Sequence, residues 1–301
     1  MIKKFPFLHL LLFIITLFST LVAGAFMTGI DILKEPEKIY KGLPFAVTLM
    51  TILMSHELSH YFASKKHRVK ATLPYFIPAP TFIGTLGAVI KMKSPIITRK
   101  ALVDIGSSGP IVGFMVSVIA TVIGLNMSEI VKLANTEGAL SFGDSILFSF
   151  LSRLILGVTP AGYDILLHPI AFAGWIGFFI TSINLLPVGQ LDGGHIVYAL
   201  FGENLHKKTS NLFFILLLFL GTTKLLMEND LFTFADSIYV YADKYLWEGW
   251  AVWAVLLLVL GLKHPPVLYW EMPLDPRRRF AGWVAFLIFA VTFIPVPIKV
   301  L

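Results

Sequence analysis

LPFAVTLMTILMSHELSHYF, residues 43–62, is the stretch on which the interpretation of this chain depends. Its first twelve residues are almost all apolar, as in a helix that lies inside a lipid bilayer. His56, Glu57 and His60 follow within the same helical run. An ionisable group at mid-bilayer costs at least about 2.5–3.5 kcal/mol on insertion scales, so such groups are seldom kept there without a function.

The composition of the chain is that of a membrane protein. Hydrophobic residues make up 56% of its 301 residues and charged residues 14%, whereas an average soluble domain has about 45–50% apolar and about 25% charged residues. The chain has no cysteine, so any metal must be held by His, Asp or Glu. The net charge of +6 fits basic residues beside membrane helices better than a nucleic-acid-binding surface.

Seven apolar segments are predicted to cross the membrane, because a helix needs about 20 apolar residues to span the hydrocarbon core. They are roughly residues 6–27, 44–63, 101–125, 166–186, 210–227, 246–262 and 280–298. With a cytoplasmic N-terminus, the cytoplasmic segments hold two thirds of the Lys and Arg residues, as the positive-inside rule requires. We therefore expect an all-α polytopic membrane protein of about six to seven transmembrane helices. It would form a single membrane-embedded domain over residues 1–301, with a core at about 44–200 and C-terminal helices at about 210–298.

Residues 71–97 do not fit a spanning helix, because four prolines and two glycines interrupt them. Within this segment GTLGAVIKMK, residues 84–93, is rich in β-compatible residues and predicts a short hairpin that re-enters the membrane from the cytoplasmic side. Such backbone is tolerated at membrane depth only where protein or a water-filled cavity covers it, so the hairpin indicates a cavity. Residues 126–165 predict an interfacial helix on the outer face.

The histidines of the opening stretch have the spacing of metal ligands. Residues four apart lie on one face of a helix, so His56 and His60 can present imidazole nitrogens to the same point. Glu57 lies about 100° further round, within reach of a water molecule at that point. H-E-x-x-H is the arrangement of zinc peptidases, with two histidine ligands and a glutamate base. The alternative is two interfacial histidines beside an unrelated glutamate; the membrane setting favours the metal.

A third ligand must come from elsewhere, because a catalytic zinc site usually has three protein ligands. The candidate stretch is NLLPVGQLDGGH, residues 184–195, in which a proline and a glycine interrupt an apolar span. Asp192 is the candidate ligand, and the two glycines after it allow close approach of the backbone. Asp192 could instead only cap a helix that starts there. His195 is a further candidate, as a ligand or as a structural group.

Three motifs occur in order on separate predicted spans. They are HELSH at 56–60, the small-residue series Gly109-x-x-x-Gly113-x-x-x-Ser117, and Asn184-x-x-Pro187-x-x-x-x-Asp192-Gly193. With these motifs the chain resembles, over most of residues 44–200, the site-2 protease family of intramembrane zinc metallopeptidases (peptidase family M50), in a form without an evident PDZ or CBS domain. The resemblance implies one Zn²⁺ per chain, bound by His56, His60 and Asp192, with Glu57 as the catalytic base.

The resemblance also implies a function. It is that of a zinc-dependent intramembrane endopeptidase, which hydrolyses peptide bonds in or near transmembrane segments of membrane proteins during regulated intramembrane proteolysis. We expect the hairpin, with Gly84, Gly87 and Ala88, to pair with the unwound backbone of a single-span substrate. Asn184 could stabilise the oxyanion or grip the substrate, or only satisfy carbonyls of the broken helix. The Gly109 series is expected to let the predicted helices at 44–63 and 101–125 pack closely.

Two rival functions remain open. The first is a transporter or ion-pathway protein with buried His, Glu and Asp, against which weighs the lack of an inverted repeat of the broken-helix motif. The second is a catalytically inactive scaffold of the same family, against which weighs the intact Glu57. We expect a bacterial-type plasma membrane, with the N-terminus and active site towards the cytoplasm. The expected partners are lipid and a membrane-protein substrate, and His264 is expected to be solvated in a cytoplasmic loop.

Overall fold

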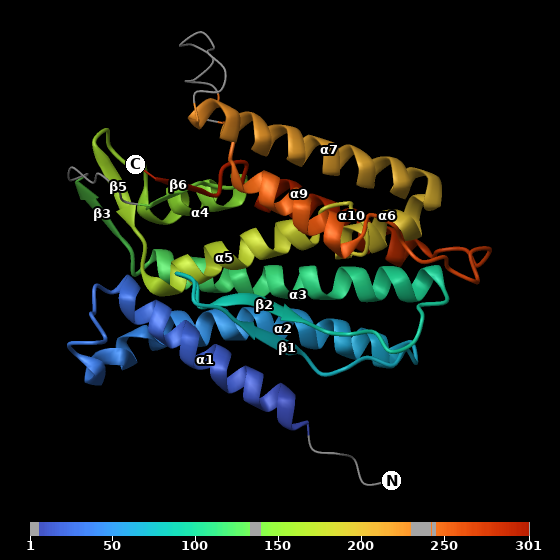
Figure 1. Cartoon of the computed structure of the whole chain (residues 1–301), viewed down its shortest axis with the longest axis horizontal. Coiled ribbons are helices and arrows are strands. Elements are labelled where there is room, and N and C mark those ends of the chain that lie inside the picture. Colours follow the sequence, from blue (N-terminus) through green and yellow to red (C-terminus); the bar gives the residue numbers. More distant parts are fainter. Residues whose placement is uncertain (1–5, 133–139, 230–241, 243–244, 301) are drawn as a thin grey trace. The chain divides into compact units, whose positions relative to one another are not determined.

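The computed structural model describes residues 6–132, 140–229, 242 and 245–300. The chain is mainly helical, with a few short antiparallel strand pairs (Figure 1). It divides into two compact units: the first unit comprises residues 1–96, 108–132 and 150–181, and the second unit comprises 97–107, 133–149 and 182–301. Three helices begin in one unit and end in the other: α3 (Arg99–Leu125), α4 (Ile146–Leu156) and α5 (Pro169–Asn184).

Within the described residues, three helices are long and apolar enough to cross a bilayer. These are α1 (Phe7–Met27), α3, and α7 (Glu203–Glu228). The helix α2 (Leu43–Lys66) has 24 residues and is about 36 Å long, but His56, Glu57 and His60 lower its apolar content. The helices α5, α9 (Gly249–Leu260) and α10 (Pro276–Thr292) have only 16, 12 and 17 residues. The chain is a multi-pass membrane protein, and the count of six to seven spans stays a prediction.

Small residues bring α1 and α2 together in the first unit. The helices are joined by a 3₁₀ turn, η1 (Pro36–Gly42), and contact each other near it. A Cβ atom added to Gly24 of α1 would lie only 2.9 Å from the Cβ atom of Phe45 at the start of α2. The two backbones can approach this closely because the contact is made by glycine, as in membrane helix pairs generally.

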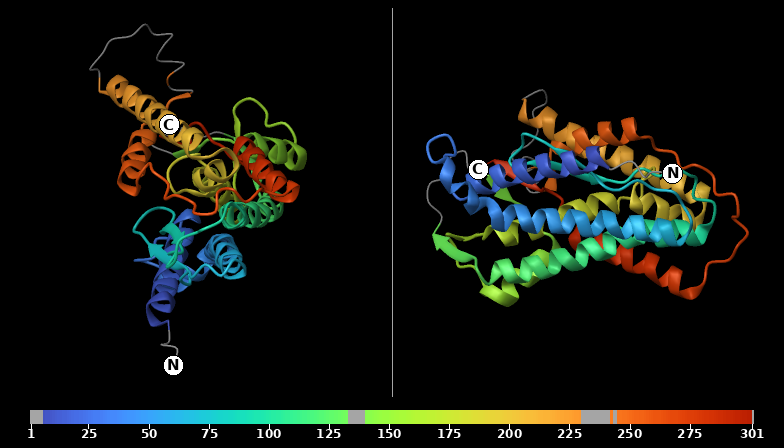
Figure 2. Two further views of the ribbon diagram at one scale, coloured as in Figure 1. Left: turned by 90° about the vertical axis from the view of Figure 1, so that its right-hand side faces the viewer. Right: turned by 90° about the horizontal axis from the view of Figure 1, so that it is seen from below.

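A two-stranded antiparallel sheet, β1 (Tyr75–Pro78) and β2 (Thr85–Val89), contacts α1 and α2 in the first unit (Figure 2). The predicted short hairpin is therefore present, but its expected extent, residues 84–93, was wrong. The partner of β2 comes from further upstream, because Tyr75-Phe76-Ile77 are good strand formers. The prolines in this region disfavour a helix, but Pro78 also occupies the end of a strand, where its missing N–H is tolerated.

The hairpin is attached to α1. The Oγ atom of Ser19 donates a hydrogen bond of 2.6 Å to the carbonyl oxygen of Gly84. The rings of Phe13 and Phe76 meet edge to face, with their centroids 5.2 Å apart. Gly84 has φ of +81°, and an added Cβ atom would lie 2.7 Å from the Cα atom of Thr20. This turn therefore needs glycine for both its conformation and its contact with α1.

The second unit is built around α6 (Asp192–Phe201), α7, α9 and α10. The helices α7 and α9 lie side by side (Figure 1), with Gly221 of α7 against Ala251 of α9. Helix α10 packs on α6, where Gly282 faces Leu200. The strands β4 (Leu140–Phe142) and β6 (Ile298–Val300) form an antiparallel pair.

An arginine fixes the start of α10. Asp275 caps the helix by accepting a hydrogen bond of 3.1 Å from the backbone N–H of Arg278. The Arg278 guanidinium forms a two-pronged ion pair with Asp104, with distances of 2.9 Å and 2.7 Å, and a further ion pair with Asp275. Paired bonds of this kind orient both partners, so α10 is tied to the first turns of α3.

The helix predicted within residues 126–165 is α4. Ile146, Phe150 and Leu154 are all exposed and lie four residues apart, which gives the helix one apolar exposed face. Its position at a membrane surface stays a prediction. Two short strands flank it in the chain, β3 (Glu129–Lys132) and β5 (Tyr163–Leu166), and they pair antiparallel with each other.

Candidate metal centre

His56 and His60 face each other one turn apart on α2. Their Nε2 atoms are 3.1 Å apart, and the rings meet at an angle of 69°. The side chains are buried, with 4% and 5% of their surface exposed. Two nitrogens bound to one tetrahedral zinc, each at about 2.0–2.1 Å, lie roughly 3.3 Å apart. The pair therefore has the spacing of two ligands of a single ion.

Glu57 is buried beside the histidine pair, with only 6% of its surface exposed. A buried carboxylate is costly unless hydrogen bonds or a positive charge compensate for its lost hydration. Three ionisable side chains within five residues of a helix make this the most polar part of the buried face of α2. A functional role for these three side chains, such as metal binding, would explain why the chain tolerates the cost of burying them.

The small-residue face of α3 makes room for both imidazoles. A Cβ atom added to Gly113 would lie 2.9 Å from Nδ1 of His56, and one added to Gly109 would overlap the His60 ring, 2.6 Å from its Cδ2 atom. Any other residue at these two positions would therefore displace a ring. The sequence analysis predicts only close helix packing for this series, so it misses the role of Gly109 and Gly113 in making room for the two imidazole rings. A signal for it was present, because the glycines are four residues apart, as the histidines are.

Ser117, the third member of the series, contacts α5 instead. Its Oγ atom donates a hydrogen bond of 2.8 Å to the carbonyl oxygen of Gly113. A Cβ atom added to Gly177 of α5 would lie 3.0 Å from the Cβ atom of Ser117, and one added to Gly174 would lie 3.0 Å from the Ser117 carbonyl oxygen. The sequence predicts the helix at 44–63 as the packing partner, and for Ser117 this was wrong, because this end of the series packs closely on α5.

Asp192 is the first residue of α6, in the second unit. As predicted, the apolar span breaks before it: α5 ends at Asn184, and residues 185–191 form a tight turn. An added Cβ atom on Gly193 would lie 2.6 Å from the Leu186 carbonyl oxygen, so this glycine permits a close backbone approach. The N-cap residue is Leu191, without a side-chain hydrogen bond to the helix end. The helix thus starts directly after Leu191, and both roles of Asp192, ligand and cap, stay predictions.

The strand β2 carries two of the expected substrate-binding residues, Gly87 and Ala88, and Gly84 precedes it directly. Ala88 pairs with Phe76 of β1. Gly87 has φ of +99°, and its N–H donates a hydrogen bond of 3.0 Å to Oγ1 of Thr85. In the described part of the chain the sheet has only two strands, so β2 has one edge that no strand of this sheet pairs.

Comparison with known proteins covers α2, which carries the two histidines, α3, which packs on their rings, and α6, which begins with Asp192. The model of peptidase family M50 matches residues 44–227, which is more than half of the chain and includes His56, His60 and Asp192. The chain belongs to peptidase family M50. The site residues therefore lie in the part of the chain that the family shares.

Several plant proteins are similar to this M50 chain. "Probable zinc metalloprotease EGY1, chloroplastic" of Arabidopsis thaliana is 39% identical over 166 residues, covering 54% of this chain and 30% of the relative. The protein of the same name from Oryza sativa subsp. japonica is 34% identical over 175 residues, covering 55% and 29%. "Probable zinc metalloprotease EGY2, chloroplastic" of Arabidopsis thaliana is 29% identical over 238 residues, covering 74% and 42%. The chain thus spans less than half the length of these relatives. No solved structure matches it.

Next to the M50 motif in α6, a histidine contact was missed by the sequence analysis. His195 and His264 share a hydrogen bond of 2.7 Å between Nδ1 and Nε2, and the His264 ring stacks on Tyr198 with centroids 4.3 Å apart. Burial lowers the pKa of His264 to about 4, so it is neutral at pH 7. The expectation of a solvated His264 was wrong, because its loop folds back onto α6. No local pattern predicts a contact between residues 69 apart.

Proposed function

We propose that this chain is a zinc-dependent intramembrane endopeptidase that hydrolyses peptide bonds in or near transmembrane segments of membrane proteins. The observation that carries the proposal is the buried His56–His60 pair, with its Nε2 atoms 3.1 Å apart. Membership of peptidase family M50 and similarity to proteins named as zinc metalloproteases support it. Regulated intramembrane proteolysis is the corresponding process.

The proposed zinc ligands are His56, His60 and Asp192. Two imidazoles and a carboxylate are a group that could hold a metal ion, and zinc peptidases use ligands of these types. The fit to zinc rests on the spacing of the imidazoles and on the space that Gly109 and Gly113 leave for the rings. Bound zinc would supply Lewis acidity that polarises the scissile carbonyl.

Glu57 is the proposed general base. It would accept a proton from the attacking water and later transfer it to the departing amine nitrogen, a role worth roughly 10²–10⁴-fold in rate. Its place directly after His56 on α2 puts the carboxylate beside the first ligand. Asn184 is proposed to donate its amide N–H to the substrate, either at the carbonyl that develops negative charge or at the adjacent backbone.

The proposed substrate is a single-span segment that must unwind before cleavage, because helical amides are engaged in their own hydrogen bonds. The unpaired edge of β2 would replace those bonds by strand addition. Of the three proposed residues, Ala88 is half-buried, whereas Gly84 and Gly87 are buried, so we propose that the substrate meets the strand first at Ala88. Leu86 and Val89 of the same strand are exposed, at 72% and 50%, and would contact apolar side chains of the substrate.

We propose a single membrane domain over residues 1–301, with about six to seven spans and the core at 44–200. The N-terminus and active site would face the cytoplasm, because α2 ends in the basic pair Lys65-Lys66. His56 precedes that end by about ten residues, which places it about 15 Å from it along the helix. A bacterial-type inner membrane is our hypothesis for the location. The relatives carry names that place those proteins in chloroplasts, so localisation of the tagged chain tests this point.

The decisive experiment compares wild type with Glu57→Gln, both purified, for zinc content and for cleavage of a model single-span protein. We expect both proteins to keep one zinc per chain and the variant to lose roughly 10²–10⁴-fold in cleavage rate. Glu37→Gln, in the 3₁₀ turn before α2, is the control and should cleave like wild type. A Glu57→Gln protein that cleaves at the wild-type rate would show that Glu57 is not the base. A wild-type protein that holds zinc but cleaves nothing would favour the scaffold.

A further inference from the structure

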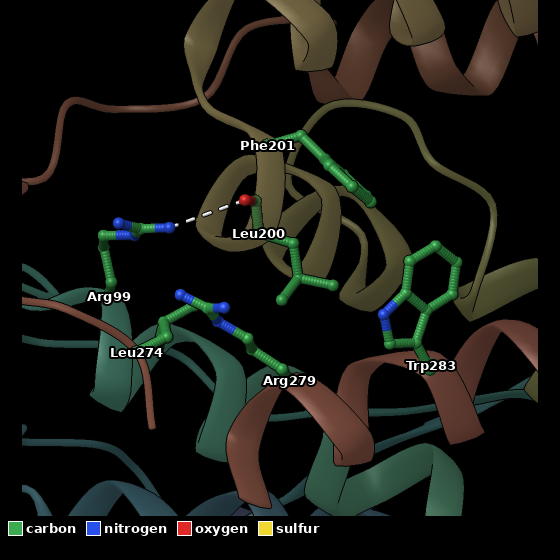
Figure 3. A pocket seen from close by; sticks show the side chains of 6 residues that line it. All are labelled: Arg99, Leu200, Phe201, Leu274, Arg279 and Trp283. Atoms are coloured by element: carbon green, nitrogen blue, oxygen red, sulfur yellow. Dashed lines mark hydrogen bonds between the residues drawn. The ribbon is translucent and has the colours of Figure 1, made fainter. Parts of the chain in front are cut away.

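A pocket at the C-terminal end of α6 gathers arginine and aromatic side chains. It lies within the second unit and has a volume of about 210 Å³. The lining residues are Arg99, Leu200, Phe201, Leu274, Arg279 and Trp283 (Figure 3). None of these belongs to the candidate metal centre, and the proposed reaction does not use them.

Arg99, the first residue of α3, is held in place on one wall of the pocket. Its Nε atom donates a hydrogen bond of 2.9 Å to the Ala199 carbonyl oxygen, and Nη2 contacts the Leu200 carbonyl oxygen at 3.5 Å (Figure 3). The guanidinium also lies over the Trp270 ring, 4.2 Å from its centroid. An arginine has five N–H donors, so these contacts orient the group and still leave donors for a ligand.

A second arginine faces the first across the pocket. The guanidinium of Arg279, on α10, points towards that of Arg99 (Figure 3). None of the six lining residues is acidic. The carboxylates of Asp104 and Asp275 both bind the neighbouring Arg278. Two guanidiniums that converge without a carboxylate between them repel each other, and an anion between them removes that repulsion and accepts bonds from both.

The opposite side of the pocket is apolar and continues along α10. Phe201 and Trp283 meet edge to face with centroids 5.9 Å apart, and they are 43% and 58% exposed. Leu287, one turn beyond Trp283, is 63% exposed. Arg279, Trp283 and Leu287 are four residues apart, so they follow one line on the helix from charge to hydrocarbon.

The two helices that supply the arginines both change from basic to apolar at this point. Arg99 and Lys100 precede the apolar run of α3, which is long enough to cross a bilayer. Residues 277–279 are all arginine and precede the apolar part of α10. Basic residues followed by apolar ones, with tryptophan between them, are typical of the depth of lipid headgroups.

We propose that this pocket binds an anionic phospholipid, with its phosphate between Arg99 and Arg279 and one acyl chain along Trp283 and Leu287. Guanidinium groups suit this ligand because their planar N–H pairs match phosphate oxygens. Attraction of anionic headgroups to basic residues at the membrane surface adds to the binding. Through Arg99, the bound lipid would also fix the C-terminal turn of α6, the helix that Asp192 begins.

Native mass spectrometry of the purified full chain tests the proposal. The chain is titrated with dioleoylphosphatidylglycerol, which is anionic, and with dioleoylphosphatidylcholine, which is zwitterionic. We expect tighter binding of phosphatidylglycerol and a loss of about tenfold in its affinity for Arg279→Gln, since a charge-assisted hydrogen bond is removed. Arg277→Gln is the matched control, because Arg277 is exposed at the start of the same helix and does not line the pocket. Its affinity should stay within about twofold of wild type.

A second variant separates the fold from the binding. Arg99→Lys keeps the positive charge but lacks the planar fork, so it should weaken phosphatidylglycerol binding while circular dichroism shows unchanged helicity. Equal affinity of wild type for the two lipids would overturn the proposal. Equal losses for Arg279→Gln and Arg277→Gln would overturn it as well, since they indicate attraction to surface charge without a site. Inorganic phosphate that competes at the same concentration as the lipid would show a site for a free anion and would refute the lipid assignment.

Discussion

Replacing Gly109 by alanine tests whether the small residues of α3 leave the space that the His60 ring needs in the candidate metal centre. The added Cβ atom would lie 2.6 Å from Cδ2 of His60, whereas ordinary contacts begin at 3.4 Å. The ring would therefore have to move by at least about 0.8 Å, because its Nε2 atom would lie closer still to the added Cβ atom, and both residues sit in a packed interior that resists such a shift. Changes that disturb the orientation of a ligand typically cost about 10–100-fold in metal affinity. We expect a loss of this size for Gly109→Ala, together with slower cleavage.

The measurement is zinc per folded chain after dialysis against a graded series of chelator concentrations. Gly113→Ala should have a smaller effect, because its added Cβ atom would lie 2.9 Å from Nδ1 of His56. Gly124→Ala, also on α3, is the control: its Cβ atom would overlap the backbone of Ala171 on α5, so it overpacks the same helix away from the histidines. It should lower stability by about 1–3 kcal/mol without changing zinc affinity. Wild-type zinc affinity in Gly109→Ala, or an equal loss in Gly124→Ala, would refute the reasoning.

Three further predictions concern the hairpin, the histidine contact and the ion pair. Ala88→Pro removes a backbone donor from β2 and should slow cleavage of a single-span substrate with bound zinc unchanged; unchanged cleavage would argue against strand addition. Burial lowers the pKa of His264 from 6.5 to about 4. Between these two pH values the unfolded chain binds more protons at His264 than the folded chain does, so the free energy of unfolding falls as the pH drops from 6.5 to 4. His264→Gln should weaken the pH dependence of thermal unfolding in that range, and an unaltered dependence would contradict this. Asp104→Asn breaks the ion pair with Arg278 and should destabilise the chain by roughly 1–3 kcal/mol, read from its melting temperature; an unchanged melting temperature would show that the pair contributes nothing.

Much of the helical framework could be predicted from the sequence, because long apolar runs have few alternatives. The predicted segments 6–27 and 101–125 correspond closely to α1 and α3. The turn between α5 and α6 was predicted from Pro187 and Gly189, which disfavour a continuous helix. The extent of the hairpin was missed, because strand pairing is a contact between separate segments and the prolines concealed the strand at Tyr75–Pro78.

The parts of the site that could be predicted from the sequence are those whose residues are close together in the chain. His56 and His60 share a helix, so their proximity follows from the four-residue interval alone. The accommodation of their rings by Gly109 and Gly113 depends on how two helices face each other, and a small-residue series does not by itself specify its partner. The contact between His195 and His264 depends on the return of a distant loop, which no periodicity predicts.

X-ray absorption spectroscopy of the zinc in the purified chain is the most direct test of the proposed centre. For wild type the account predicts about one zinc per chain with two imidazole nitrogens at about 2.0–2.1 Å and at least one carboxylate oxygen at a similar distance. In Asp192→Asn the oxygen contribution should change and the zinc affinity should fall. A spectrum and affinity in Asp192→Asn identical to those of wild type would contradict the claim that Asp192 completes the site.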